Sequence, residues 1–251
     1  MEVRFIGIPH PSDIEAGASL AKGALKASRQ QGYEPKKGAI LVVKLKAISK
    51  ALGLWLDTSS LIPSVFALAL ADLTGKDPGL TEAILMHAKR LVRAKEGVLL
   101  VETKSGIVCA NAMLDRSNTG RGPEWVLCPP EDIDAEAKRF GVVLSGLLGF
   151  HVPVIVSDTL GRPFRLGQTD VAVGLWGLDP FFDMRGQKDG YGYLLKDTCI
   201  ALADELAAGA ELACGKTKGV PFVWVEGVAY EENLEGSARR LERPSHKNLF
   251  P

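Results

Sequence analysis

The sequence predicts a mixed α/β (α+β) fold in which helices and strands are interleaved. Three observations lead to this prediction. Residues 38–45 form an almost continuous apolar run, which is typical of a mostly buried strand, and residues 220–225 form a second such run. Between them, apolar residues in 133–147 recur at steps of three and four, the period of one buried helical face. Elements of both kinds therefore occur throughout the chain, with no repeat and no low-complexity segment.

The other elements are predicted in chain order from the same patterns. Residues 81–93 place apolar side chains on one helical face, and 97–102 with 106–112 indicate a β-hairpin. Either Asp132 or Asp134 is placed to cap the helix that follows. Further strands are expected over 125–128, 152–156 and 170–175, and a helix over 198–214 that Gly215 ends.

The bulk properties favour one domain, 1–251, made of two closely associated lobes with a possible boundary near 75–79. The formal net charge is zero, which argues against a general nucleic-acid or membrane-surface binder. The longest apolar region, 62–73, is interrupted by polar residues and is too short to span a bilayer. The first residues lack the apolar core of a signal peptide, so the cytoplasm is the expected location.

The string Ser-Asp158-Thr159-Leu-Gly-Arg162-Pro-Phe-Arg165 carries the most chemistry. It follows the predicted strand 152–156, and active sites of α/β proteins gather at the carboxyl ends of strands. A carboxylate and a hydroxyl there suit a hard cation such as Mg²⁺ or Mn²⁺. If Pro163 opens a helical turn, the two arginines converge on one anionic part of a substrate. The alternative is that Asp158 caps a turn and that the arginines form surface ion pairs.

Three weaker signals complete the candidate site. Asp115 lies in a turn rich in acidic and amide groups and is a second candidate carboxylate for the cation, or forms only an Asx turn. Glycines flank Lys216 and Thr217 in residues 215–219, which suits a phosphate-contacting loop or a solvated turn; the spacing is not that of a Walker loop. Lys50 is either a phosphate contact or a solvated lysine.

Taken together, these stretches resemble the coenzyme F420:L-glutamate ligase (F420-0:gamma-glutamyl ligase) family, and its bacterial members more than its archaeal ones. They occur in the family's order, and the string 157–165 is highly specific. The stretches are residues 47–50, 109–112, 115–118, 157–165, 171–174, 203–206, 215–216 and 219–221.

The resemblance implies a GTP- and metal-dependent ligase that forms an intertwined homodimer. The carboxylate of a phospholactyl deazaflavin precursor would be phosphorylated, and the amine of L-glutamate would displace the phosphate to give an amide. It assigns the metal ligands to Asp115, Asp158 and Thr159, and assigns no residue to deprotonation of the amine. It assigns nucleotide contacts to Lys50, Asn118 and the loop with Gly215, Lys216, Thr217 and Gly219.

The chain departs from the family pattern at three places. Leu45-Lys46 replaces a small polar pair, residues 112–115 replace a turn that contains glycine, and Lys216 stands near an acidic, metal-binding position of archaeal members. We expect Lys216 to replace the charge of a second metal ion and to point at the nucleotide phosphates. Two alternatives stay open: a paralogue that ligates another carboxylate and amine, and a non-catalytic nucleotide-binding protein.

Overall fold

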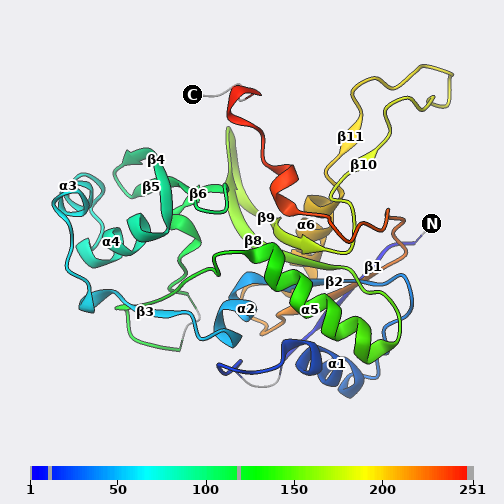
Figure 1. The fold of residues 1–251 in the computed structure, drawn as a ribbon, viewed down its shortest axis with the longest axis horizontal. Coiled ribbons are helices and arrows are strands. Elements are labelled where there is room, and N and C mark those ends of the chain that lie inside the picture. Colours follow the sequence, from blue (N-terminus) through cyan, green and yellow to red (C-terminus); the bar gives the residue numbers. More distant parts are fainter. Residues whose placement is uncertain (1, 11–12, 118–119, 248–251) are drawn as a thin grey trace.

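A five-stranded sheet forms the centre of the larger lobe (Figure 1). The structure is a computed structural model that describes residues 2–10, 13–117 and 120–247. The strand order is β1-β12-β2-β8-β9, with β2 and β8 parallel and the other neighbours antiparallel. The strands are β1 (Arg4–Ile8), β12 (Phe222–Glu226), β2 (Ile40–Lys44), β8 (Val154–Arg162) and β9 (Arg165–Trp176).

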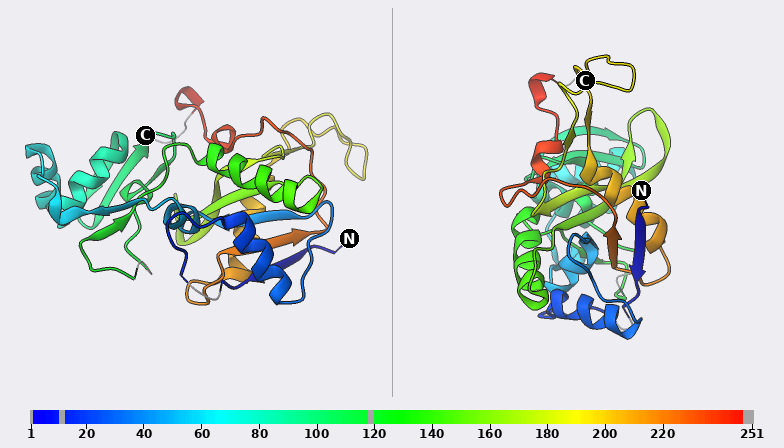
Figure 2. Two further views of the ribbon diagram at one scale, coloured as in Figure 1. Left: turned by 60° about the horizontal axis from the view of Figure 1, so that its bottom comes forward. Right: turned by 90° about the vertical axis from the view of Figure 1, so that its right-hand side faces the viewer.

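Helices cover both faces of this sheet, and Figure 2 shows α5 and α1 on one side and α6 on the other. Successive residues of β2 point to opposite faces, so Leu41 and Val43 pack with α1, α2 and α5, whereas Ile40 and Val42 pack with α6. Burial on both faces explains the continuous apolar run in β2. The helices are α1 (Leu20–Gln30), α2 (Leu45–Ala51), α5 (Ile133–Leu148) and α6 (Leu202–Cys214).

The smaller lobe has its own apolar core, in which α3 and α4 pack on short antiparallel strands. Leu70 of α3, Ile84 of α4 and Val101 of β5 belong to this one cluster. The lobe boundary expected near 75–79 is not found there, because the chain passes from α3 to α4 at this point and both helices share the core of the smaller lobe. The elements are β3 (Trp55–Asp57), α3 (Val65–Thr74), α4 (Pro78–His87), β4 (Ala88–Lys95), β5 (Val98–Thr103), β6 (Val108–Ala110) and β7 (Trp125–Leu127).

The mixed α/β class, the two lobes and most predicted elements are confirmed. The hairpin is β5–β6, which pair in antiparallel register. Of the two candidate caps, Asp132 is the one that caps α5: its Oδ1 accepts a hydrogen bond from Ala135 N at 3.0 Å. A small ribbon of β10 (Phe182–Asp183) and β11 (Cys199–Ile200) also leaves the larger lobe (Figure 1).

Two predicted helices are too long. The helix expected over 81–93 ends at His87, because the residues that follow form β4 and pair with β5 along their length. That ladder satisfies the backbone groups, and it outweighs the helical spacing of Leu91 and Val92. The helix expected over 198–214 begins at Leu202, because Cys199 and Ile200 pair with β10 instead. Across the described ranges, no helix is both long enough and apolar enough to cross a bilayer.

Candidate functional site

A cavity of about 480 Å³ brings together residues from most of the predicted motifs. It lies where the segment after β1, the end of β2, α2, β8 and the loop after α6 meet the segment that holds Asp115 and Ser117. Its lining combines carboxylates and hydroxyls with lysines, which is an arrangement suited to phosphates and a cation. The lining residues are His10, Asp13, Ile14, Lys44, Lys46, Ala47, Lys50, Asp115, Ser117, Asp158, Thr159, Gly215, Lys216, Thr217, Gly219, Val220 and Pro221.

Asp158 and Thr159 reach the cavity from within a strand, not from its end as the sequence predicted. β8 continues to Arg162, and Asp158 and Thr159 pair with Val171 and Asp170 of β9. The pairing register shifts between Val156 and Ser157, where the strand passes from the buried core to the cavity wall. Pairing with β9 satisfies the backbone of residues 157–162, which explains why the strand does not stop at Ser157.

Burial of the Asp158 carboxyl raises its pKa from 3.8 to about 7. The Thr159 backbone N–H lowers this pKa, the charges of Asp115 and Asp170 raise it, and Lys44 lowers it. By surface area Asp158 is only partly buried, because one side faces the cavity, whereas protein atoms crowd its other sides. A bound cation or the ammonium of a lysine would favour the charged form.

A buried network behind Thr159 is the main feature that the sequence reasoning missed. Asp170 is fully buried and pairs with the ammonium of Lys44. It also accepts hydrogen bonds from Ser157 Oγ at 2.9 Å and from Thr159 Oγ1 at 2.7 Å. The available signal was the polar residue at the end of each predicted strand, since parallel pairing of β2 with β8 sets Lys44 beside Ser157.

Asp115 enters the cavity on a short segment that pairs with β7. Its backbone N–H donates to Leu127 O at 3.0 Å, and Leu127 N–H donates to Asp115 O at 2.9 Å. The carboxylate accepts from Ser117 N at 2.7 Å and from Ser117 Oγ at 2.8 Å, the pattern of an Asx turn. Its other oxygen lies 2.6 Å from Lys46 Nζ. Asp115 thus forms an Asx turn and also lines the cavity with Asp158; its role as a metal ligand stays a prediction.

Three consecutive left-handed residues precede this segment. Asn111, Ala112 and Met113 have φ of 55°, 52° and 60°, respectively. For residues other than glycine this conformation costs about 1–2 kcal/mol each, with asparagine the most tolerant. The sequence shows no sign of this conformation beyond the departure at 112–115.

The candidate nucleotide contacts Lys50 and Lys216 also line the cavity. Lys50 Nζ donates to Asp13 Oδ1 at 2.6 Å, which holds the ammonium at the wall and lowers the pKa of Asp13. Gly215 and Gly219 have φ of 58° and 62°, so glycine suits both ends of the loop. Lys216 Nζ contacts Thr159 Oγ1 and lies 3.6 Å from Glu211 Oε1. The predicted contact Asn118 lies outside the described residues.

Arg162 and Arg165 are not brought to this cavity. They face each other across the turn of the β8–β9 hairpin, and no helical turn forms at Pro163. Phe164 occupies the turn with φ of 59°, and Arg162 Nη2 donates to Leu166 O at 2.8 Å. Four residues of extended chain carry Arg162 about 13 Å beyond Asp158. Their role in substrate binding stays a prediction.

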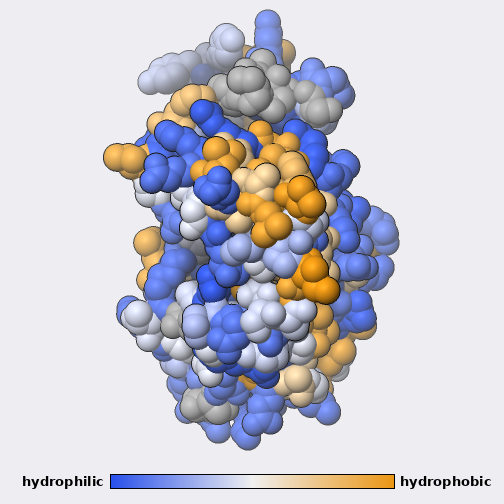
Figure 3. All heavy atoms as spheres, turned by 90° about the vertical axis from the view of Figure 1, so that its left-hand side faces the viewer, coloured by the Kyte–Doolittle hydropathy of each residue, from blue (hydrophilic) through white to orange (hydrophobic). Residues whose placement is uncertain are grey.

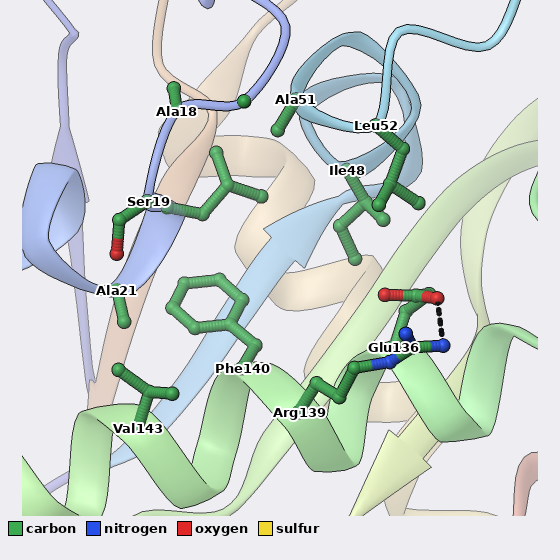
Figure 4. A pocket seen from close by; sticks show the side chains of 12 residues that line it. Ala18, Ser19, Ala21, Ile48, Ala51, Leu52, Glu136, Arg139, Phe140 and Val143 are labelled. Atoms are coloured by element: carbon green, nitrogen blue, oxygen red, sulfur yellow. Dashed lines mark ion pairs between the residues drawn. The ribbon is translucent and has the colours of Figure 1, made fainter.

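A second cavity, of about 280 Å³, lies on the other side of α2 and is mainly apolar (Figure 4). Ile48 of α2 and Phe140 of α5 line it, and the ion pair between Arg139 and Glu136, at 2.6 Å, borders it. None of the predicted site residues lines it. The chemistry is therefore assigned to the larger cavity.

The oxygen donors of the larger cavity suit one divalent cation. A carboxylate offers about four lone pairs; Asp115 uses three, for Ser117 N, Ser117 Oγ and Lys46. Thr159 Oγ1 donates to Asp170 and contacts Lys216. Asp158 completes a set of three protein oxygens, to which phosphate oxygens or water would add the remaining ligands. Within the described ranges, no group of three His, Cys, Asp or Glu residues is arranged to hold a metal by itself.

Comparison with known proteins agrees with this geometry. The family model of F420-0:gamma-glutamyl ligases matches residues 9–227, which include every residue that lines the cavity. The chain belongs to the F420-0:gamma-glutamyl ligase family. It is therefore a ligase that forms amide bonds.

Relatives of this ligase align over nearly their whole length. A protein of Methanothermobacter thermautotrophicus is 38% identical over 252 residues, covering 100% of this chain and 99% of the relative. One of Methanopyrus kandleri is 37% identical, covering 99% and 97%, and one of Methanocaldococcus jannaschii is 37% identical, covering 87% and 86%. Each is named coenzyme F420:L-glutamate ligase. These relatives are archaeal, so the expected bacterial type stays a prediction.

Proposed function

We propose that this ligase joins L-glutamate to the carboxylate of coenzyme F420-0, a phospholactyl deazaflavin, with GTP as the co-substrate. The observation that carries the proposal is the single cavity in which Asp115 and Asp158 face Lys50 and the glycine-bounded loop 215–219. A nucleoside triphosphate needs cationic groups along its phosphates, and a carboxylate acceptor needs charge neutralisation beside the γ-phosphate. Both are available within this cavity.

The reaction would proceed through an acyl phosphate. An oxygen of the acceptor carboxylate attacks the γ-phosphorus, the bond to the bridging oxygen breaks, and GDP leaves. The neutral amine of glutamate then attacks the acyl carbon, inorganic phosphate leaves with the bonding electrons, and the amine loses a proton to give the amide. Lys50 and Lys216 would hold the phosphates and offset their charge, because ammonium groups bond phosphate oxygens directly.

One Mg²⁺ or Mn²⁺ ion is part of the proposal. Asp115, Asp158 and Thr159 would hold it, and its charge would neutralise phosphate oxygens during transfer. Work in the cytoplasm and assembly as a homodimer are also proposed. A surface of exposed apolar side chains supports the dimer: Ile62, just before α3, is 91% exposed, and Val65, its first residue, is 85% exposed. Figure 3 shows apolar side chains gathered on this face of the molecule.

Incubation of the purified protein with coenzyme F420-0, GTP, Mn²⁺ and L-glutamate tests the proposal. Mass spectrometry should find the acceptor heavier by one glutamyl residue or more, together with GDP and phosphate in equal amounts. GDP release without a glutamylated acceptor would instead support a paralogue that acts on another carboxylate. Nucleotide binding with no turnover for any acceptor would support the non-catalytic alternative.

A further inference from the structure

The ammonium of Lys46 occupies an oxygen-lined position beside Asp115. A lysine ammonium has three N–H donors and no acceptor. Lys46 Nζ has three oxygen partners: Asp115 Oδ2 at 2.6 Å, Ser117 O at 2.6 Å and Ser117 Oγ at 2.9 Å. The side chain is 25% exposed. All three donors are satisfied, so the charge is held in one place, as an oxygen cage holds a small cation.

Two further lysines repeat this pattern along the same wall. Lys44 pairs with the buried Asp170, and Lys216 contacts Thr159 Oγ1. Three ammonium groups thus accompany the three carboxylates of Asp115, Asp158 and Asp170. Three positive charges that are covalently part of the chain therefore stand among the carboxylates of this region, which also include Glu211, 3.6 Å from Lys216 Nζ.

Lys46 differs from an ordinary surface ion pair in two respects. A solvated pair leaves a long lysine side chain free to move and contributes about 0–1 kcal/mol. Here the stem rises from α2, whose Leu45 and Ala47 are buried on either side, and the ammonium contacts a backbone carbonyl as well as the carboxylate. The position beside Asp115 Oδ2 is therefore filled by a cation that belongs to the chain itself.

We infer that the ammonium of Lys46 supplies the positive charge that a further divalent cation at Asp115 would bring, so that this site works with a single divalent ion. The inference rests on the proposed function only where the test counts Mn²⁺ ions in the presence of GTP. Lys46 supplies positive charge but no open coordination position, so the only lone pairs left for a metal are those that Asp115, Asp158 and Thr159 retain. Lys216 adds a second fixed positive charge near the site, through its contact with Thr159 Oγ1.

Manganese binding without nucleotide tests Lys46 directly. The full chain and its K46M variant would be titrated with Mn²⁺, with bound ion measured by electron paramagnetic resonance. K46M keeps the volume of the side chain and removes its charge, so we expect it to gain one Mn²⁺ per chain that binds at least about tenfold tighter than anything in the unmodified protein. The double variant K46M/D115N should lose that ion again. K26M, the same change on an exposed lysine of α1, should match the unmodified chain.

Two results would overturn the inference. One is a K46M protein, folded by circular dichroism, that binds Mn²⁺ no better than the unmodified chain; K46A repeats the comparison if K46M does not fold. The other is two Mn²⁺ ions per unmodified chain in the presence of GTP, where we expect one. If GTP does not bind at all, the proposed function fails, while the comparison without nucleotide still decides the role of Lys46.

Discussion

Asp158→Asn is expected to stabilise the fold above pH 7 while removing a charge that the site needs. The pKa of this carboxyl is about 7 in the folded chain and has an ordinary value of 3.8, mainly because of burial. Between these values the folded chain holds a proton that the unfolded chain has lost. The free energy of unfolding therefore falls as pH rises from about 4 to about 7, and stays low above that range. An asparagine amide carries no charge, so its burial does not lower the free energy of unfolding as pH rises.

The size of the effect follows from the same two pKa values. A difference of about three pH units corresponds to at most about 4 kcal/mol. Water reaches Asp158 from the cavity and screens part of this cost, so the expected difference at pH 8 is about 2 kcal/mol. For a chain of this length, that raises the melting temperature of the variant by about 4–8 °C. At pH 4 the carboxyl is protonated in the folded chain and about half protonated in the unfolded chain, so most of the difference disappears and the two proteins should melt close together.

Thermal unfolding of both proteins from pH 4 to 8.5, with EDTA present, measures this difference. Asp72→Asn, at an exposed position of α3, serves as the control and should leave the curve unchanged. The same Asp158 variant should lose Mn²⁺-dependent activity at every pH. An Asp158→Asn protein that melts below the unmodified chain by the same amount at pH 4 and pH 8 would refute the reasoning, since burial of the charge would then not be the main cost.

Three other substitutions test separate parts of the site. Asp170→Ala should lower the free energy of unfolding in urea by about 3–5 kcal/mol, because it leaves Lys44 and two hydroxyls without their buried acceptor; a loss below about 1 kcal/mol would contradict the buried network. Lys50→Met should weaken GTP binding about tenfold by calorimetry, and unchanged binding would show that Lys50 serves only Asp13. Arg162→Lys, like the same change at position 165, should raise the KM for an anionic substrate, because lysine cannot make the bidentate contact; unchanged kinetics in both would make these arginines surface charges of the hairpin.

Local patterns in the sequence were enough for most of the elements. The apolar runs of β2 and β12 are buried on both faces of the sheet, and the three- and four-residue spacing of α5 faces its core. Residue chemistry was also enough to select Asp115, Asp158, Thr159 and Lys216 as candidates that meet in one cavity. Carboxylate and hydroxyl oxygens suit cations, lysines suit phosphates and glycines suit tight loops, and these preferences do not depend on the position of a residue in the chain.

Pairing between strands that are distant in the sequence decided where several elements end and which residues reach the cavity. His87 ends α4 because the next residues find backbone partners in β5, and β8 runs past Asp158 because β9 pairs with it. The same hairpin carries Arg162 away from the cavity, although it lies only four positions from Asp158. No local pattern contains this information, since it depends on which strand lies alongside.

The sequence by itself determined the family, the mixed α/β class and the residue types available for chemistry, because these follow from motif identity and local periodicity. Only the tertiary structure decided which charges meet. Lys46 and Asp115 are far apart in the chain, yet their side chains lie 2.6 Å apart. The parallel register of β2 with β8 places Lys44 beside Ser157 and its partner Asp170. Electrostatic energy depends on distance in space, so which charges offset one another became visible only in the folded chain.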